Sequence, residues 1–248
     1  MCKKKDCPYF EVNCGGEGND ELNCICPKYK AYKATMDPIK RQEMINKLGV
    51  VAEDKMDTML KMQKIFASRF HKIDNLTNPE IDKWTKDYLV CIEDEILEAS
   101  EFLPIYEEVI KEYDEKEYRK ELIDIIHFLM DAMLVSGITE DYLIEKLDDK
   151  EVLNKIYKNC EIKTNLRYED TLNYLLRDLR LTRQHINWKH WKKEKPLNIE
   201  NIRAALLNMY KHLIMAFKLS GMTVDDIYNV YIDKNVENQF RQKFGYGK

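Results

Sequence analysis

The sequence predicts an all-α fold, a helical bundle built from a tandem pair of helix hairpins. Only 8 of the 248 residues are glycine and 34% are charged, a composition that favours long helices over sheet and loop. Apolar residues recur at helical spacing over almost the whole chain after residue 40. One pattern of helices and turns occurs twice, at a constant offset of 84 residues.

The composition also limits the class of protein. A net charge of −4 gives no global sign of nucleic-acid binding or of a polybasic membrane surface. The N-terminus does not resemble a signal peptide, because it is polar and rich in cysteine. The most apolar window, residues 123–137, is too short for a membrane span and contains three ionisable side chains. We therefore expect a soluble, cytoplasmic protein that binds neither nucleic acid nor a membrane.

Residues 1–40 form a cysteine-rich segment before the predicted helical domain of residues 41–248. Five of the 7 cysteines lie in it: Cys2, Cys7, Cys14, Cys24 and Cys26. Without a secretion signal, such clustering favours a bound metal over disulfides. The paired C-x2-C spacing of zinc knuckles is missing, however. Zn²⁺ or another thiolate-bound metal at these cysteines therefore stands beside the alternative of reduced, weakly ordered cysteines.

The first two helices of the domain each carry a polar residue on an apolar stripe. A helix over about residues 41–71 places Met56, Met59, Gln63, Phe66 and Phe70 on one face, and Gln63 is its polar member. The second helix covers about residues 78–103, with Asn78 as N-cap and Pro79 at the first helical position. Its polar member is Glu95.

The remaining helices follow from caps and glycines. A third helix covers about residues 116–136 and ends at Gly137, a glycine in the C′ position. Thr139 caps a shorter helix over 140–147. Three further helices are predicted over about 168–191, 198–220 and 223–244, and Asn198 and Thr223 cap the last two.

The repeat is clearest at its turns. Ser136-Gly-Ile-Thr recurs as Ser220-Gly-Met-Thr, and the same offset pairs apolar positions such as Leu129 with Leu213. Any two amphipathic helices can be aligned by chance. The repeated corner favours a true duplication of one helix hairpin over such chance matching.

Four carboxylates form a candidate metal site: Glu95, Glu98, Glu121 and Asp124. Each pair is three residues apart, so its members share a helix face. If the two helices are antiparallel neighbours, the four groups converge, and such convergence requires cations. Oxygen ligands select Mg²⁺ or Mn²⁺. The alternative is a solvated acidic face, but the repeat partners of the four are all uncharged: Leu179, Thr182, Ala205 and Asn208.

The last helix changes from an apolar to an amide face. Ile227 and Tyr231 are followed on one stripe by Asn235, Asn238 and Gln242. Inward-facing amides suit a polar ligand with donors and acceptors, such as a pyrimidine or a deoxyribose. Lys234 and Arg241 flank this stripe and could hold phosphates. A frayed, solvated helix is the alternative.

These motifs carry a family resemblance. The E-x-x-E pair, followed by Glu121-Leu-Ile-Asp-Ile-Ile-His-Phe, resembles the all-α nucleotide pyrophosphohydrolases, the group of MazG and the dimeric dUTPases. Met59-Leu-Lys-Met-Gln-Lys-Ile-Phe and the closing stretch from Asn235 to Tyr246 resemble the dUTPase branch. The resemblance covers residues 56–246.

The resemblance implies metal-dependent hydrolysis of dUTP, and also of dUDP, to dUMP, with pyrophosphate released from dUTP. It implies a homodimer in which the partner chain completes each site. Glu95 and Glu98 would be catalytic, with Glu95 activating water. The implied substrate-binding residues are Gln63, Phe128, Lys234, Asn235, Asn238, Arg241 and Tyr246. Among them, Gln63 and the two asparagines would recognise uracil and sugar.

Other functions stay open at this point. The nearest is a MazG-like or dCTP-type pyrophosphohydrolase with another base preference. Asp124-x-x-His127 also resembles half of a di-iron carboxylate site, although the repeat offers only Asn208 and Lys211 as a second half. A third alternative is a non-enzymatic regulator built around the cysteines. The aromatic and basic run from Trp188 to Lys193 fits a basic helix end or a lid near the phosphates better than a nucleic-acid site.

Overall fold

The computed structural model describes residues 54–103, 114–189 and 191–244, together with Gln42, Glu43, Ile45, Asn46 and Gly49. Of the side chains after Gln239, nothing is described. The five N-terminal cysteines and Tyr246 therefore lie outside the described residues. The chain divides into two compact units, Val51–Tyr231 and a second one formed by Met1–Val50 with Ile232–Lys248.

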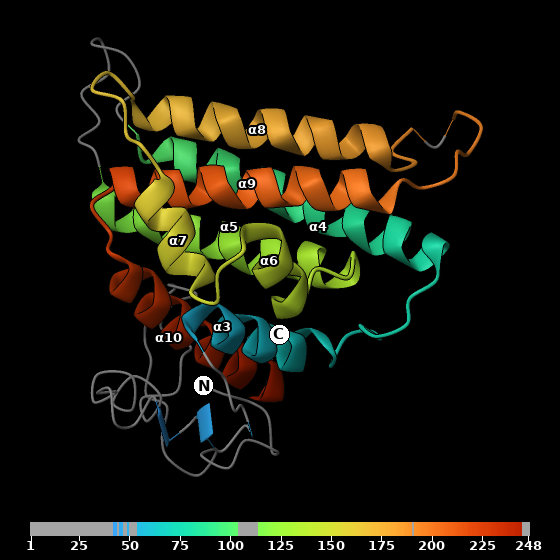
Figure 1. Ribbon diagram of the computed structural model, residues 1–248, viewed down its shortest axis with the longest axis horizontal. Helices are drawn as coiled ribbons and strands as arrows, with labels where there is room; N and C mark the ends of the chain where they lie inside the picture. The colour runs from blue at the N-terminus through green and yellow to red at the C-terminus, as the bar shows by residue number, and fades with distance from the viewer. Residues whose placement is uncertain are drawn as a thin grey trace, which may run out of the picture. The chain divides into compact units, whose positions relative to one another are not determined.

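The described residues form helices and contain no strand, so the predicted all-α class is confirmed. Figure 1 shows these helices, whose bounds are α3 (Lys55–Ala67), α4 (Asn78–Glu101), α5 (Glu115–Val135), α6 (Glu140–Leu147), α7 (Val152–Asn159), α8 (Tyr168–His185), α9 (Ile199–Leu219) and α10 (Val224–Phe244).

Helix α3 is shorter than predicted. It begins after Asp54, which has an extended backbone and accepts a hydrogen bond from the Asp57 N–H at 2.7 Å. This cap satisfies a backbone donor that has no partner within the helix. The helix ends at Ala67, so Phe70 lies beyond it and is 59% exposed. The prediction that Phe70 belongs to the buried stripe was therefore wrong, whereas Met56, Met59 and Gln63 are buried as expected.

The N-cap of α4 is Thr77, one residue before the predicted Asn78. Glu80 reaches back to the Thr77 backbone N–H at 2.8 Å, as in a capping box. The buried stripe of α4 is also shifted from the predicted one, since it runs through Thr85, Leu89, Ile92, Ile96 and Ala99. Glu95 consequently lies half-buried at the edge of this stripe instead of within it.

Helix α8 ends at His185, six residues before the predicted end at residue 191. Ile186 is extended, and the Asn187 N–H donates to Oδ1 of the buried Asp82 at 2.7 Å, which directs the chain out of the helix. The short helix α7 was not predicted at all. Its buried face consists of Val152, Leu153 and Ile156, too few positions to show a helical period in the sequence.

Two antiparallel helix pairs make up the centre of the Val51–Tyr231 unit. Helix α4 packs on α5, and α8 packs on α9; α5 also contacts α9, and α4 contacts α8 (Figure 1). The bounds of α5 and α9 differ by the repeat offset at both ends, from Glu115 to Ile199 and from Val135 to Leu219. After each helix comes a glycine with positive φ, 77° at Gly137 and 78° at Gly221.

The repeat has a reciprocal contact that the sequence did not reveal. Arg119 Nε in α5 donates to the Ser220 carbonyl at the end of α9, at 3.0 Å. Arg203 Nε in α9, which is Arg119 plus 84, donates to the Ser136 carbonyl at the end of α5, at 2.7 Å. A cation at a helix C-terminus satisfies a carbonyl and interacts favourably with the helix dipole. Each central helix therefore caps the other.

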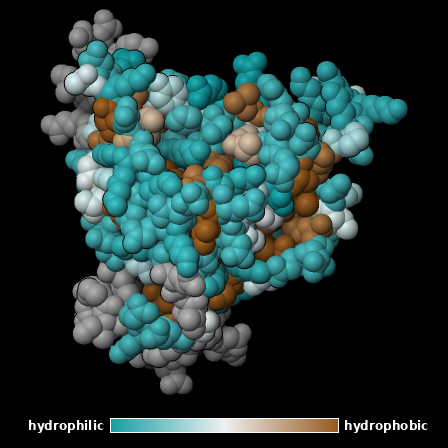
Figure 2. All heavy atoms as spheres, viewed as in Figure 1, coloured by the Kyte–Doolittle hydropathy of each residue, from teal (hydrophilic) through white to brown (hydrophobic). Residues whose placement is uncertain are grey.

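Within the described residues, no single helix has the length and apolar run needed to span a bilayer; α5 and α6 reach that criterion only when counted together, across a bend of 93°. The face in Figure 2 is mainly hydrophilic, with apolar surface in separate areas. The large apolar side chains most exposed in the described part are Phe70, Val90, Leu97, Leu181, Trp191 and Val230.

Candidate active site

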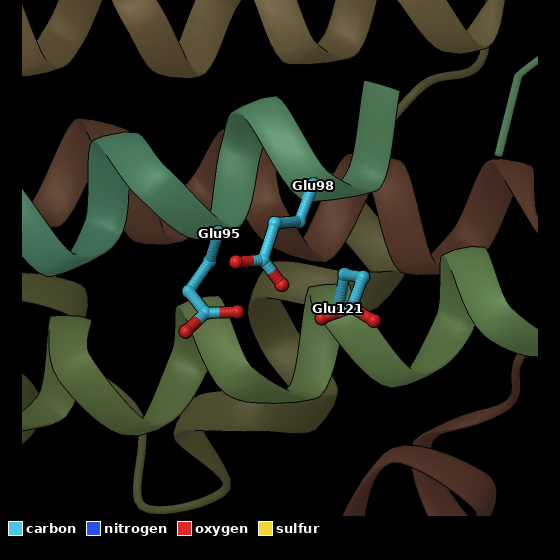
Figure 3. Close-up of side chains that lie close together, drawn as sticks. All are labelled: Glu95, Glu98 and Glu121. Carbon is cyan, nitrogen blue, oxygen red and sulfur yellow. The ribbon is translucent and has the colours of Figure 1, made fainter. Parts of the chain in front are cut away.

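Three carboxylates meet between α4 and α5. Glu95 and Glu98 are one helical turn apart on α4, and they project toward Glu121 on α5 (Figure 3). One oxygen from each of the three lies within 4.8 Å of the others. The packing of α4 on α5 thus brings together three of the four residues predicted for the metal site.

Asp124 follows one turn after Glu121 on α5 and is half-buried. It does not belong to the group of oxygens within 4.8 Å. Its charge nevertheless acts on Glu95, because it is the first of the neighbouring charges that raise the Glu95 pKa. Asp124 therefore lies beside the cluster, and its role as a fourth ligand stays a prediction.

Glu95 has an unusual pKa. Burial, followed by the charges of Asp124, Glu98 and Glu121, raises the pKa of Glu95 to about 8. At neutral pH this cluster therefore holds either a proton or a cation. The donors are all carboxylate oxygens, which fits a hard divalent ion such as Mg²⁺ or Mn²⁺.

Gln63 lies in a second polar cluster, inside the Val51–Tyr231 unit. Its side chain is fully buried, at 0% exposure. The Gln63 Nε2 donates to Asp131 Oδ1 at 2.8 Å. The Gln63 Oε1 accepts from His127 Nδ1 at 2.9 Å and from the Tyr231 hydroxyl at 2.8 Å. Both ends of the amide are therefore held by protein groups.

Asp131 is buried in this cluster, so the alternative of a solvated Asp131 is wrong. Burial raises the pKa of Asp131 to about 8, although the hydrogen bond from Gln63 acts in the opposite direction. A carboxyl with this pKa is largely protonated at neutral pH. It then places a neutral group in the core and avoids the cost of an unpaired buried charge.

A family model described as dUTPase matches residues 55–246 of the chain. The chain belongs to the dUTPase family. The match includes every described helix, and with them the carboxylates of α4 and α5 and the Gln63 cluster. This dUTPase is accordingly a dUTP diphosphatase, which excludes the alternative of a non-enzymatic regulator. No curated protein and no solved structure gave a match.

In the second hairpin of the dUTPase, side-chain packing closes the region that corresponds to the carboxylate cluster. Leu179, Thr182 and Ala205 stand at the positions of Glu95, Glu98 and Glu121, and all three are buried. Asn208, at the position of Asp124, is exposed. None of these four side chains can supply a negative charge, so the metal site of this dUTPase is confined to α4 and α5.

The predicted substrate residues of α10 belong to the second compact unit. Asn235 is buried and its Oδ1 accepts from Gln239 Nε2 at 2.7 Å, while Lys234 and Asn238 are half-buried. Arg241 lies in α10, but its side chain is outside the described part. Phe128, on α5, is half-buried. The contacts of these residues with substrate stay predictions.

Tyr231 is the member of the Gln63 cluster that the sequence did not single out. It was counted as part of an apolar stripe, yet its hydroxyl contacts Gln63 and its ring stacks on His127, with the ring centroids 4.3 Å apart. A buried tyrosine generally needs a hydrogen-bond partner for its hydroxyl. The signal available was the polar side chains of Gln63, His127 and Asp131 at otherwise apolar positions.

Proposed function

We propose that this dUTPase converts dUTP to dUMP and pyrophosphate with a divalent cation held by Glu95, Glu98, Glu121 and Asp124. The observation that carries the proposal is the convergence of Glu95, Glu98 and Glu121 from two helices. When bound, the cation neutralises charge on the phosphate oxygens during displacement. Mg²⁺ is the first candidate and Mn²⁺ the second, because both prefer oxygen ligands.

Glu95 is proposed as the group that orients the attacking water and takes its proton. A general base works best when its pKa lies near the working pH. Glu95 meets this condition, with a pKa of about 8 in the absence of metal, and it lies at the half-buried edge of α4. Glu98 is more exposed and would serve mainly in charge neutralisation.

The substrate would be held at three places. Gln63, Asn235 and Asn238 would recognise uracil and sugar, since amides both donate and accept hydrogen bonds. Lys234 and Arg241 would bind the phosphates, and Phe128 and Tyr246 would pack against the nucleotide. Acceptance of dUDP and a homodimer that completes each site with partner residues belong to the same proposal, and the family membership supports them.

A nucleotide panel tests this function. The purified protein is assayed with dUTP, dUDP, dCTP and dTTP in Mg²⁺, and the nucleotide and phosphate products are identified. The expected result is dUMP and pyrophosphate from dUTP, with dCTP and dTTP at least tenfold slower in kcat/KM. EDTA should stop turnover, and Mg²⁺ should restore it. Equal rates for dCTP would point to the alternative pyrophosphohydrolases, and full activity in EDTA would contradict the metal site.

A further inference from the structure

The Gln63 amide is held by three side chains whose hydrogen-bonding roles differ. Asp131 Oδ1 accepts from the Nε2 end, and His127 Nδ1 and the Tyr231 hydroxyl donate to the Oε1 end. The two ends of an amide have the same shape but opposite hydrogen-bonding character. Rotation by 180° would place Oε1 against a carboxyl oxygen and the NH₂ group against two donors. The three neighbours therefore favour one of the two amide orientations.

We propose that Asp131, His127 and Tyr231 are positioning residues that fix the Gln63 amide and thereby make this enzyme prefer dUTP over dCTP. The inference rests on the proposed role of Gln63 in recognising uracil. Uracil presents a carbonyl oxygen at C4 where cytosine presents an amino group, so an acceptor is replaced by a donor. An amide that could rotate freely would pair with either base. An amide held in one orientation pairs well with only one of them.

The backbone around the cluster also holds it in place. The Tyr231 hydroxyl lies 3.1 Å from the Met59 carbonyl, one turn before Gln63 on α3, as well as 2.8 Å from Gln63 Oε1. The Tyr231 ring stacks on His127 at an interplanar angle of 18°. His127 and Asp131 are one turn apart on α5. The cluster thus joins α3, α5 and the first part of α10, and its members have low exposure: Gln63 0%, His127 4%, Asp131 4% and Tyr231 0%.

Tyr231→Phe is the main test, because it removes one oxygen and keeps the stacked ring. We expect the ratio of kcat/KM for dUTP to that for dCTP to fall by about five- to tenfold, the usual effect of one buried hydrogen bond. The change should lie mainly in KM for dUTP, with kcat within about twofold, because the carboxylates of α4 and α5 are untouched. Asp131→Ala should act in the same direction, whereas Asp131→Asn, which keeps an acceptor, should retain the preference.

Tyr210→Phe is the matched control. Tyr210 is also fully buried, and its hydroxyl also contacts α3, where it donates to Met56 Sδ at 3.2 Å. It makes no printed contact with the Gln63 amide, so its removal should leave the base preference unchanged. In a Gln63→Ala background, Tyr231→Phe should cause no further loss of preference, since the residues act through the same group.

Three results would overturn the inference. The first is an unchanged dUTP-to-dCTP ratio in Tyr231→Phe and Asp131→Ala while the wild-type enzyme prefers dUTP; the proposed function would then stand alone. The second is an equal fall in Tyr210→Phe, which would indicate general loosening of the core. The third is a wild-type enzyme without any preference for dUTP, which would overturn the uracil proposal together with the inference. If Asp131→Ala does not fold, Tyr231→Phe decides the question.

Discussion

Glu121 and Glu95 show how the chemistry of a residue depends on which side chains face it. Each is an ordinary glutamate of an E-x-x-E or E-x-x-D pair, on a helix with many exposed acids. Across the α4–α5 contact they become members of one cluster with oxygens within 4.8 Å. Asp94, next to Glu95 in the chain, is exposed instead.

The carboxylates can be tested one by one. Glu121→Gln should lower kcat for dUTP by at least about 100-fold, because it removes one charge from the metal site with little change in shape. Asp124→Asn should also lower it strongly. The measurement is steady-state turnover in Mg²⁺, with helicity followed by circular dichroism. Asp94→Asn is the control and should keep near-normal turnover; near-normal turnover in Glu121→Gln would refute the site.

Glu95 should also make stability depend on pH when metal is absent. Its pKa is raised in the folded protein from an ordinary value of 4.5 to about 8, so folding favours the protonated form. This contribution to stability is complete below about pH 4.5 and is lost as the pH rises through 8. The melting temperature in EDTA should therefore fall between pH 6 and pH 9, and Mg²⁺ should raise it most at the higher pH.

Glu95→Gln separates this effect from that of Asp131, whose pKa is raised into the same range. The variant should show a shallower fall of melting temperature with pH in EDTA, and a smaller rise with Mg²⁺. Part of the slope should remain, because Asp131 still titrates. A slope as steep as that of the wild type would show that Glu95 does not titrate as proposed.

At the scale of helices, the reciprocal arginines link the two hairpins. Arg203 caps α5 and Arg119 caps α9, at the turns that the repeated Ser-Gly corner forms. The corner needs glycine because its φ is positive, and at Gly137 an added Cβ would also lie 2.6 Å from Arg203 Nη2. The repeated corner therefore has a structural reason beyond the helix end itself.

Removal of one of these arginines should weaken folding without affecting the site chemistry. Arg203→Ala should lower the free energy of unfolding by about 1–3 kcal/mol, since a buried carbonyl loses a charged donor. Chemical denaturation with circular dichroism measures this loss. The exposed Arg180 of α8 is the control, and Arg180→Ala should change stability by less than about 0.5 kcal/mol. A loss no larger than that in Arg203→Ala would show that the cap contributes little.

At the scale of the whole molecule, the cysteine segment should be dispensable for chemistry. The match to the dUTPase family begins at residue 55, after all five N-terminal cysteines. Deletion of Met1–Lys28 should therefore leave kcat/KM for dUTP within about twofold of the full chain. The same assay with a zinc chelator and added Mg²⁺ is the control for a thiolate-bound metal. Loss of turnover on deletion would instead assign the segment a role in the unit that contains Lys234 and Asn235.

The sequence by itself determined the all-α class, most of the helices, the repeat and the carboxylate pairs, because these depend on spacing along a helix. Helix ends were less predictable, since Asp54, Thr77 and Asn187 stop or start helices through individual hydrogen bonds. The buried stripe of α4 was displaced by one residue because burial depends on the neighbouring helix as well as on periodicity.

Only the tertiary structure decided how Gln63 is surrounded. Its partners His127, Asp131 and Tyr231 lie 64, 68 and 168 residues away in the chain. It also decided the raised pKa values of Glu95 and Asp131, since desolvation depends on what packs around a group. The physical reason is the range of the interactions: helical periodicity is local, whereas hydrogen bonds and burial in a core join residues that are distant in sequence.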